Sequence, residues 1–395
     1  MLWLNGGPGS STIASGLLFE LGPCTVAPTG TYTRRNPHSW TEKLNILFID
    51  QPIGTGYSYA TSGPLVTTLD DLAVDVYALL QIFFRQFPQY AARPFHLAAE
   101  SWGGHYAPHI AHYIFSQNEQ IMGAQLAEND ERIWVNLTSV TMANGLTEPA
   151  SQFESILQYL CMDSPYPLMD WDDPRCVALR TGSPACIRAI KACYRFPHSK
   201  ATCSAATWAC WPGYMSAPIT SLGKNPYDIR QNCDVLKNSS NLCYPEFDAI
   251  SQWLNRTETK LALGVDPSLH FVITNTTVNE AFYNEGQAMQ NSAALLPELI
   301  KGGVRVLAYA GNTGRCSLAS FETRLPIPSD ILSDAVCNHM GIQLWMSRLE
   351  HVFHDEFERA LERPWVTDTG FHVGMVRKAG PGAGNFAFVQ IFDAG

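Results

Sequence analysis

Residues 94–108 read PFHLAAESWGGHYAP, and this stretch decides the fold. The apolar run Pro94–Glu100 predicts a buried strand, and the residues after it predict a helix through Tyr113. Between the two, AESWGG places Ser101 on a sharp strand-to-helix turn, a nucleophile elbow, which presents the hydroxyl at the carboxyl edge of a sheet. The usual pattern is G-x-S-x-G, and here Ala99 stands in place of the first glycine. An ordinary serine-containing turn is the alternative interpretation.

Strand and helix patterns alternate on both sides of this turn. Such alternation is typical of a mostly parallel sheet with helices on both faces, so we expect an α/β fold. Further strands are predicted at Leu44–Asp50, Ser139–Gly145, Val304–Gly311 and Phe386–Gly395, and a helix is predicted at Leu69–Phe87.

The predicted sheet is interrupted by a segment of different composition. Residues 150–262 are rich in Cys, Pro and Trp and have little strand signal, which is typical of a cap inserted between strands. We therefore expect a first part of the core at 1–149, the cap at 150–262, and a second, incomplete part of the core at 263–395.

The composition excludes several classes of function. Of the 395 residues 46% are apolar and 16% are charged, which indicates a globular chain. The formal net charge of −10 and the lack of a Lys/Arg block argue against a nucleic acid or an anionic membrane as partner. No apolar run is long enough to span a bilayer. No cofactor is indicated, and the oligomeric state stays open.

The cysteines predict a disulfide-stapled cap and an oxidising compartment. Scattered thiols and a zinc site are the alternatives, but the ligand spacing of a zinc site is absent. Four N-x-[ST] sequons, at Asn136, Asn238, Asn255 and Asn275, agree with the secretory pathway, with secretion and a vacuole both left open. Because MLWLNGGPG is not a signal peptide, we expect the N-terminus to be truncated. Eight of the 11 cysteines lie in the cap: Cys161, Cys176, Cys186, Cys193, Cys203, Cys210, Cys233 and Cys243.

A second glycine-bearing motif begins directly after a predicted strand. Asn5-Gly6-Gly7-Pro8-Gly9 lets backbone N–H groups approach a ligand closely, as an oxyanion hole requires. An ordinary strand-to-loop turn is the alternative, and phosphate binding fits poorly because no lysine follows.

Together, these and further blocks resemble the serine carboxypeptidase family, and the chain is similar to its fungal-type members. The resemblance implies an α/β-hydrolase fold with a Cys-rich cap. It also implies a serine-type peptidase that needs no metal or cofactor and releases C-terminal amino acids from peptides and proteins through an acyl-enzyme. The blocks occur in the family's order and are WLNGGPGSS (Trp3–Ser11), FELGP (Phe19–Pro23), NILFIDQPIGTGYSY (Asn45–Tyr59), AESWGGHYAP (Ala99–Pro108), ANGLTEP (Ala143–Pro149), NPYDIRQNC (Asn225–Cys233) and DAVCNHMG (Asp334–Gly341).

The resemblance assigns roles to individual residues. Ser101 would be the nucleophile, and the backbone N–H groups of Gly7 and Trp102 would form the oxyanion hole. The family has Tyr at the position of Trp102, and a backbone donor should tolerate this difference. Asn5 and Glu100, supported by Glu20, would bind the terminal carboxylate of the substrate.

The implied carboxylate site has a physical consequence. An ionised glutamate repels a carboxylate, so Glu100 has to be protonated to donate a hydrogen bond. Crowded carboxyl groups share protons with raised pKa values. We therefore expect the enzyme to bind peptides best at acidic pH.

The acid of the triad is expected at Asp334. LAYAGNT (Leu307–Thr313) resembles the family sequence, whereas the 20 residues Gly314–Ser333 do not. If these 20 residues are left out, LAYAGNT is followed directly by DAVCNHMG, as the family pattern requires. A retained intron and a genuine insertion are both open. Asp330 lies inside this segment and is rejected as the triad acid. Cys316 also lies inside it, and without this segment the chain has ten cysteines. Cys337 resembles a family cysteine near the active site.

The family's histidine is expected in an A-G-H-M-V-P block, and this chain ends one residue short of it, at Gly395. His105, His109 and His112 share a helix face but lack the pattern of a metal site, so a structural role is expected for them. His339, His351, His354 and His372 match no family histidine.

We therefore expect the chain to be truncated at both ends and nearly inactive as it stands, because loss of a triad member costs about 10⁴–10⁶-fold in kcat. An acyltransferase or esterase of the same fold and a non-catalytic peptide-binding protein are the alternatives.

Overall fold

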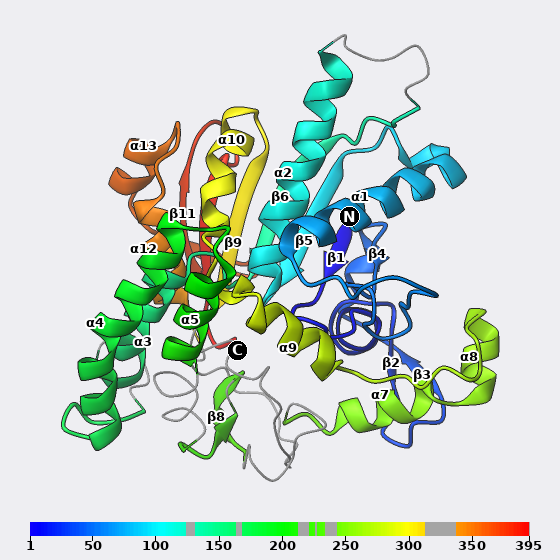
Figure 1. Ribbon diagram of the computed structural model, residues 1–395, viewed down its shortest axis with the longest axis horizontal. Coiled ribbons are helices and arrows are strands. Elements are labelled where there is room, and N and C mark those ends of the chain that lie inside the picture. The colour runs from blue at the N-terminus through cyan, green and yellow to red at the C-terminus, as the bar shows by residue number, and fades with distance from the viewer. Residues whose placement is uncertain are drawn as a thin grey trace.

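The computed structural model describes residues 1–123, 131–162, 168–211, 221–225, 227–233, 243–312 and 337–394. Within these residues an eight-stranded sheet forms the centre, in the order β10-β11-β12-β9-β6-β5-β1-β4 (Figure 1). Neighbouring strands from β12 to β4 are parallel, and β11 is antiparallel to both of its neighbours. The bounds are β1 Leu2–Leu4, β4 Leu47–Phe48, β5 Phe95–Glu100, β6 Leu137–Ala143, β9 Arg305–Gly311, β10 Arg363–Val366, β11 His372–Ala379 and β12 Phe386–Ile391.

The helices pack on this sheet and on one another. Helix α2 contacts β5, β6, α1 and α10, and α12 contacts β9 and α3. No helix among the described residues is long and apolar enough to cross a membrane. The bounds are α1 Leu69–Gln86, α2 Gly103–Met122, α3 Pro149–Cys161, α4 Pro174–Arg195, α5 Lys200–Cys210, α7 Glu246–Leu254, α8 Thr257–Leu263, α9 Thr276–Asn284, α10 Leu296–Lys301, α12 His339–Arg348 and α13 His354–Arg359.

Helix α1 illustrates how local sequence sets an element. The Thr68 hydroxyl accepts a hydrogen bond from the Asp71 N–H, which caps the first turn. Two acidic residues in that turn and Arg85 in the last turn favour the helix dipole. Leu72, Val76 and Leu80 are buried on one face, and the predicted helix is confirmed as Leu69–Gln86.

The strand predicted at Leu44–Asp50 is much shorter in the structure. Only Leu47–Phe48 pair with β1, because β1 itself has three residues and offers no longer partner. The helix predicted to reach Tyr113 continues to Met122. Strands β10 and β11 were not predicted at all.

The cap cysteines form disulfides, as predicted. Two of the bonds, Cys186–Cys210 and Cys193–Cys203, join α4 to α5. Their partners lie seven residues apart on both helices, which is about two helical turns, so both bonds lie on one face of the pair. The other two are Cys161–Cys176 and Cys233–Cys243, while Cys24 and Cys337 lie outside all four.

The predicted domain boundaries after residues 149 and 262 stay predictions. Figure 1 shows the cap helices α3, α4 and α5 together at one end of the molecule, in green. Strand β8 (Asp228–Asn232) and helix α7, which also belong to the predicted cap, lie below the sheet in this view. The second residue after β12 is tied to this region, because Arg230 donates a hydrogen bond to the carbonyl of Asp393.

Candidate active site

Ser101 occupies the turn between β5 and α2. Its φ of 59° lies in the left-handed region, which a non-glycine residue adopts only when its surroundings impose it. The strand and helix meet closely here, since a Cβ on Gly103 would lie 2.5 Å from the Cβ of Ala99. Small residues on both sides of Ser101 therefore permit the tight turn, and its local geometry is that of the predicted elbow.

The loop Asn5–Gly9 lies against the elbow. A Cβ on Gly6 would overlap the backbone nitrogen of Trp102, so only glycine fits there. Gly7 has a φ of 109° and lines the same cavity as Ser101. Trp102 is buried and is not among the described residues that line that cavity.

Asp50 ties the segment that follows the glycine loop to the turn at Tyr57, and it was not predicted as a site residue. Its buried carboxylate accepts hydrogen bonds from the Ser11 hydroxyl at 2.6 Å, the Ile13 N–H at 3.0 Å and the Tyr57 N–H at 3.1 Å. Burial raises the pKa of Asp50. An acidic residue directly after an apolar strand, as in LFID, is the sequence signal that could have indicated it.

Two carboxyl groups share one amide beside Ser101. Asn5 Nδ2 donates to Glu100 Oε2 at 2.5 Å and lies 3.0 and 3.2 Å from the two oxygens of Glu20. Trp3 Nε1 donates to Asn5 Oδ1 at 3.0 Å, which fixes the amide so that its nitrogen faces the carboxyl groups. The three predicted carboxylate-binding residues therefore form one connected group.

The carboxyl pair is electrostatically unusual. Burial, together with the charge of Glu100, raises the pKa of Glu20 well above its usual value, and burial raises the pKa of Glu100. Two close carboxylates in a partly dry site repel each other, so the pair retains a proton to higher pH than isolated glutamates do.

These groups line one cavity of about 210 Å³. An aromatic wall lines the same cavity as the carboxyl pair: Phe19 packs on Tyr244 and Phe247 with ring centroids 5.3 and 4.7 Å apart, and Tyr227 lies beside Tyr244. The described residues that line the cavity are Asn5, Gly6, Gly7, Ser10, Ser15, Phe19, Glu20, Glu100, Ser101, Asn144, Tyr227, Tyr244 and Phe247.

The eleven histidines all lie in the described ranges, and none is among the residues that line this cavity. His105 is buried, its Nδ1 lies 2.7 Å from Ser292 Oγ, and burial lowers its pKa to about 3. His109 pairs with Asp70 and His112 with Glu298. No group of metal-binding side chains was found within the described residues.

Several predicted residues fall outside the described ranges. Asp334, the predicted triad acid, is one of them, as are Asp330, Cys316 and all of Gly314–Ser333. The sequon at Asn238 is another.

A profile of the serine carboxypeptidase family matches residues 1–320. The chain belongs to the serine carboxypeptidase family. The family match ends at residue 320, inside the segment Gly314–Ser333 that is predicted to depart from the family pattern.

Two fungal proteins illustrate the serine carboxypeptidase relationship. Carboxypeptidase Y homolog A of Sclerotinia sclerotiorum is 34% identical over 401 residues, and that of Pyricularia oryzae is 35% identical over 401 residues. Both alignments cover 100% of this chain and 63% of the relative, so the chain spans less than two thirds of the length of these relatives.

A solved serine carboxypeptidase-like fold supports the architecture. Kex1Δp, a prohormone-processing carboxypeptidase from Saccharomyces cerevisiae, superposes with a TM-score of 0.75 at 22% identity, covering 100% of this chain and 78% of the other. The predicted α/β-hydrolase fold is confirmed by this likeness and by the mostly parallel sheet.

The left-handed φ of Ser101 predicts an effect on stability. We expect Ser101→Gly to be more stable than Ser101→Ala by about 1 kcal/mol, because glycine adopts this conformation without a Cβ clash. The free energy of unfolding from urea titration measures the difference. At the helical control position Ser251 the order should reverse, since glycine weakens a helix. If Ser101→Gly were less stable than Ser101→Ala, the backbone at position 101 would not be strained by a Cβ.

Proposed function

We propose that the cavity at Ser101 carries out serine carboxypeptidase chemistry on the C-terminal residue of a peptide or protein. One observation carries the proposal: Asn5, Glu20 and Glu100 form a hydrogen-bonded group in the same cavity as a serine on a strained elbow. The amide and a protonated carboxyl can both donate hydrogen bonds to a terminal carboxylate. A carboxylate held there places the last peptide bond of a substrate near the serine.

In the proposed reaction, Ser101 Oγ attacks the carbonyl carbon of that peptide bond. A base takes the hydroxyl proton and returns it to the departing amine, and water then hydrolyses the acyl-enzyme. The backbone N–H groups of Gly7 and Trp102 are proposed as the oxyanion hole. This assignment is supported by the close packing of the glycine loop against the Trp102 nitrogen.

Asp334 remains the proposed acid of the triad. The base is proposed to be a histidine at the carboxyl edge of the sheet, as in the family's A-G-H-M-V-P block. The aromatic wall of Phe19, Tyr244 and Phe247 is proposed to face the side chain that the enzyme removes.

Binding of the substrate carboxylate is testable without turnover. We expect an N-acetylated peptide ending in phenylalanine to bind at pH 5 at least about tenfold more tightly than its C-terminal amide, because a charge-assisted hydrogen bond is lost with the amide. Isothermal titration calorimetry measures both affinities. Asn5→Ala should remove the preference, whereas Asn136→Ala, at an exposed asparagine, should keep it. Equal binding of acid and amide to the unaltered chain would exclude carboxylate recognition.

The four disulfides fit folding in an oxidising compartment of the secretory pathway. Secretion and residence in a vacuole are both compatible with this.

Among the described sequons, we propose Asn136 as the glycosylated residue. Its side chain is exposed, whereas the Nδ2 of Asn255 donates to the carbonyls of Ser251 and Phe271 and that of Asn275 donates to Gly54. A glycan on either of the latter would displace a donor hydrogen. In a eukaryotic secretory host, Asn136→Gln should therefore remove one glycan by mass spectrometry, and Asn255→Gln should remove none.

A further inference from the structure

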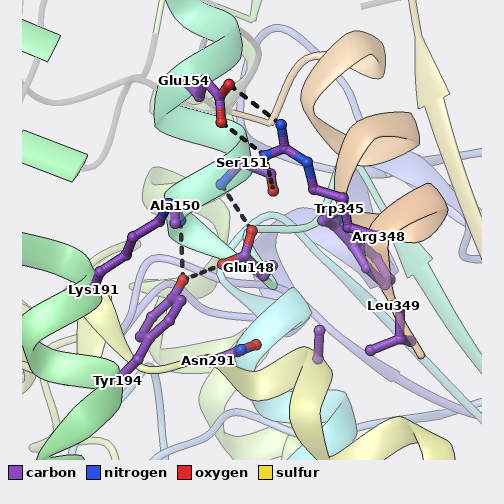
Figure 2. A pocket seen from close by; sticks show the side chains of 11 residues that line it. Glu148, Ala150, Ser151, Glu154, Lys191, Tyr194, Asn291, Trp345, Arg348 and Leu349 are labelled. Carbon is purple, nitrogen blue, oxygen red and sulfur yellow. Dashed lines mark hydrogen bonds and ion pairs between the residues drawn. The ribbon is translucent and has the colours of Figure 1, made fainter. Parts of the chain in front are cut away.

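A second cavity, of about 400 Å³, lies where α3, α4 and α12 meet (Figure 2). It shares no described lining residue with the Ser101 cavity. Figure 2 shows Lys191 and Tyr194 of α4 on one side, Trp345 and Arg348 of α12 on the other, and Glu148 between them. Its volume is in the range of small-molecule sites. Its lining residues are Glu148, Ala150, Ser151, Glu154, Lys191, Tyr194, Asn291, Ala293, Trp345, Arg348 and Leu349.

Two of the four charged groups in this cavity neutralise each other. Arg348 forms a bidentate ion pair with Glu154, with N–O distances of 2.7 and 3.3 Å, and also donates to Ser151 Oγ at 3.1 Å. Glu148 and Lys191 have no ion pair of their own among the described residues, although the charge of Lys191 acts on Glu154 and that of Glu148 acts on Arg348.

These two remaining charges are held differently. Glu148 accepts the Tyr194 hydroxyl at 2.5 Å and the Ser151 N–H at 2.7 Å, which fixes its orientation and leaves lone pairs on both oxygens. The ammonium of Lys191 has no hydrogen-bond or ion-pair partner in the described part of the chain. A fixed anion and an available cation therefore line the same cavity.

Two polar atoms of the lining are buried and have no hydrogen-bond partner within the part of the chain that the structure describes. They are the Oδ1 of Asn291, an acceptor, and the indole Nε1 of Trp345, a donor, and Trp345 is only 1% exposed. Buried polar groups in native proteins are nearly always hydrogen-bonded, so each of these invites a partner. Around them, Ala150, Ala293 and Leu349 supply apolar surface.

From this arrangement we infer that the second cavity binds a free α-amino acid with an apolar side chain, as its zwitterion. The ammonium of the ligand pairs with the Glu148 carboxylate and with the side-chain Oδ1 of Asn291. Its carboxylate pairs with Lys191 on the α4 side of the cavity, and its side chain lies on the apolar wall. A simple anion meets two glutamates there, and a simple cation meets Lys191 and Arg348, so opposite charges on one small molecule match the cavity best.

The test is calorimetric titration of L-phenylalanine into the chain that carries Asn5→Ala, which weakens binding at the Ser101 cavity. We expect a Kd of about 1 mM, as suits a ligand of this size. Lys191→Met should weaken binding at least about tenfold, through loss of a charge-assisted bond. The matched control Lys301→Met, at an exposed lysine on α10, should bind as before.

Two ligand analogues and a second variant complete the test. L-Phenylalaninamide lacks the carboxylate and 3-phenylpropionate lacks the ammonium, and both should bind at least about tenfold more weakly than L-phenylalanine. Glu148→Gln keeps a side-chain oxygen that can accept the Ser151 N–H at the start of α3. This variant should weaken the binding of L-phenylalanine but not that of 3-phenylpropionate. Unchanged binding in Lys191→Met, equal binding of 3-phenylpropionate, or no binding in the Asn5→Ala background would each overturn the inference. Melting temperatures confirm that the variants are folded.

Discussion

A chain lengthened after Gly395 by the family's His-Met-Val-Pro sequence is expected to hydrolyse C-terminal peptide bonds at least about 10⁴-fold faster than residues 1–395 alone, since a missing general base costs a serine peptidase that much. The reason is that none of the eleven histidines lines the cavity at Ser101. Release of phenylalanine from an N-acetylated peptide, followed by mass spectrometry, measures the rate.

The geometry of the sheet permits this rescue. Strand register places Val389 level with Tyr309, Ala143 and Glu100 in successive strands, so β12 reaches the edge that carries Ser101. Three strand spacings separate β12 from β5, which is about 14 Å. A histidine five residues beyond Ile391 can span about 17 Å of extended chain.

Three controls separate catalysis from improved folding. The same extension with asparagine in place of histidine should give no rescue, and Ser101→Ala in the lengthened chain should abolish it. Asp334→Asn should also lower the rate by about 10⁴-fold, whereas Asp330→Asn should not, if Asp334 is the triad acid. A rate no higher with histidine than with asparagine would instead favour the non-catalytic peptide-binding alternative.

Peptide affinity is expected to fall as the pH rises, by roughly tenfold per unit once the shared proton of Glu20 and Glu100 is lost. Both carboxyl groups have raised pKa values, so the protonated form that donates to a substrate carboxylate prevails at acidic pH. Calorimetric Kd values for the same peptide between pH 4 and 8 measure this. Glu100→Gln keeps a donor but cannot ionise, and it should flatten the profile. A Kd independent of pH in the unaltered chain would rule out proton-dependent recognition.

The same raised pKa values have a consequence for stability. The folded state holds a proton that the unfolded chain releases near pH 4.3, the ordinary glutamate pKa, and folding therefore favours the protonated form. The free energy of unfolding should fall as the pH rises from there to the raised folded-state pKa. Glu100→Gln should lessen that fall, and Glu119→Gln, at an exposed glutamate on α2, should leave it unchanged.

The sequence predicted the parts of the molecule that local pattern determines. The elbow at Ser101 was predictable because a buried strand, a tight turn and a helix each leave a signal within a few residues. Strand β10 was missed because its four residues are all exposed and include Pro364, so neither alternation nor an apolar run marks it. The role of Asp50 depends on donors from Ser11 and Ile13, which are distant in the sequence and which only tertiary packing brings to it.

The candidate site was predicted mainly through the family resemblance, since residues as distant as Asn5 and Glu100 carry no local sign of their contact. The aromatic wall of Tyr244 and Phe247 comes from the cap, where the family pattern is weakest, and it was not foreseen. Disulfide pairing was left open, although the equal spacing of Cys186 to Cys193 and Cys203 to Cys210 was a usable signal for two bonded helices.

The two bonds between α4 and α5 determine what a protease can achieve in the cap. The link between the helices, residues 196–199, is bracketed by Cys193–Cys203 and again by Cys186–Cys210. A cut within that link would therefore release no fragment. The nicked protein would migrate as a single species in electrophoresis and come apart into two pieces only after a thiol reductant is added.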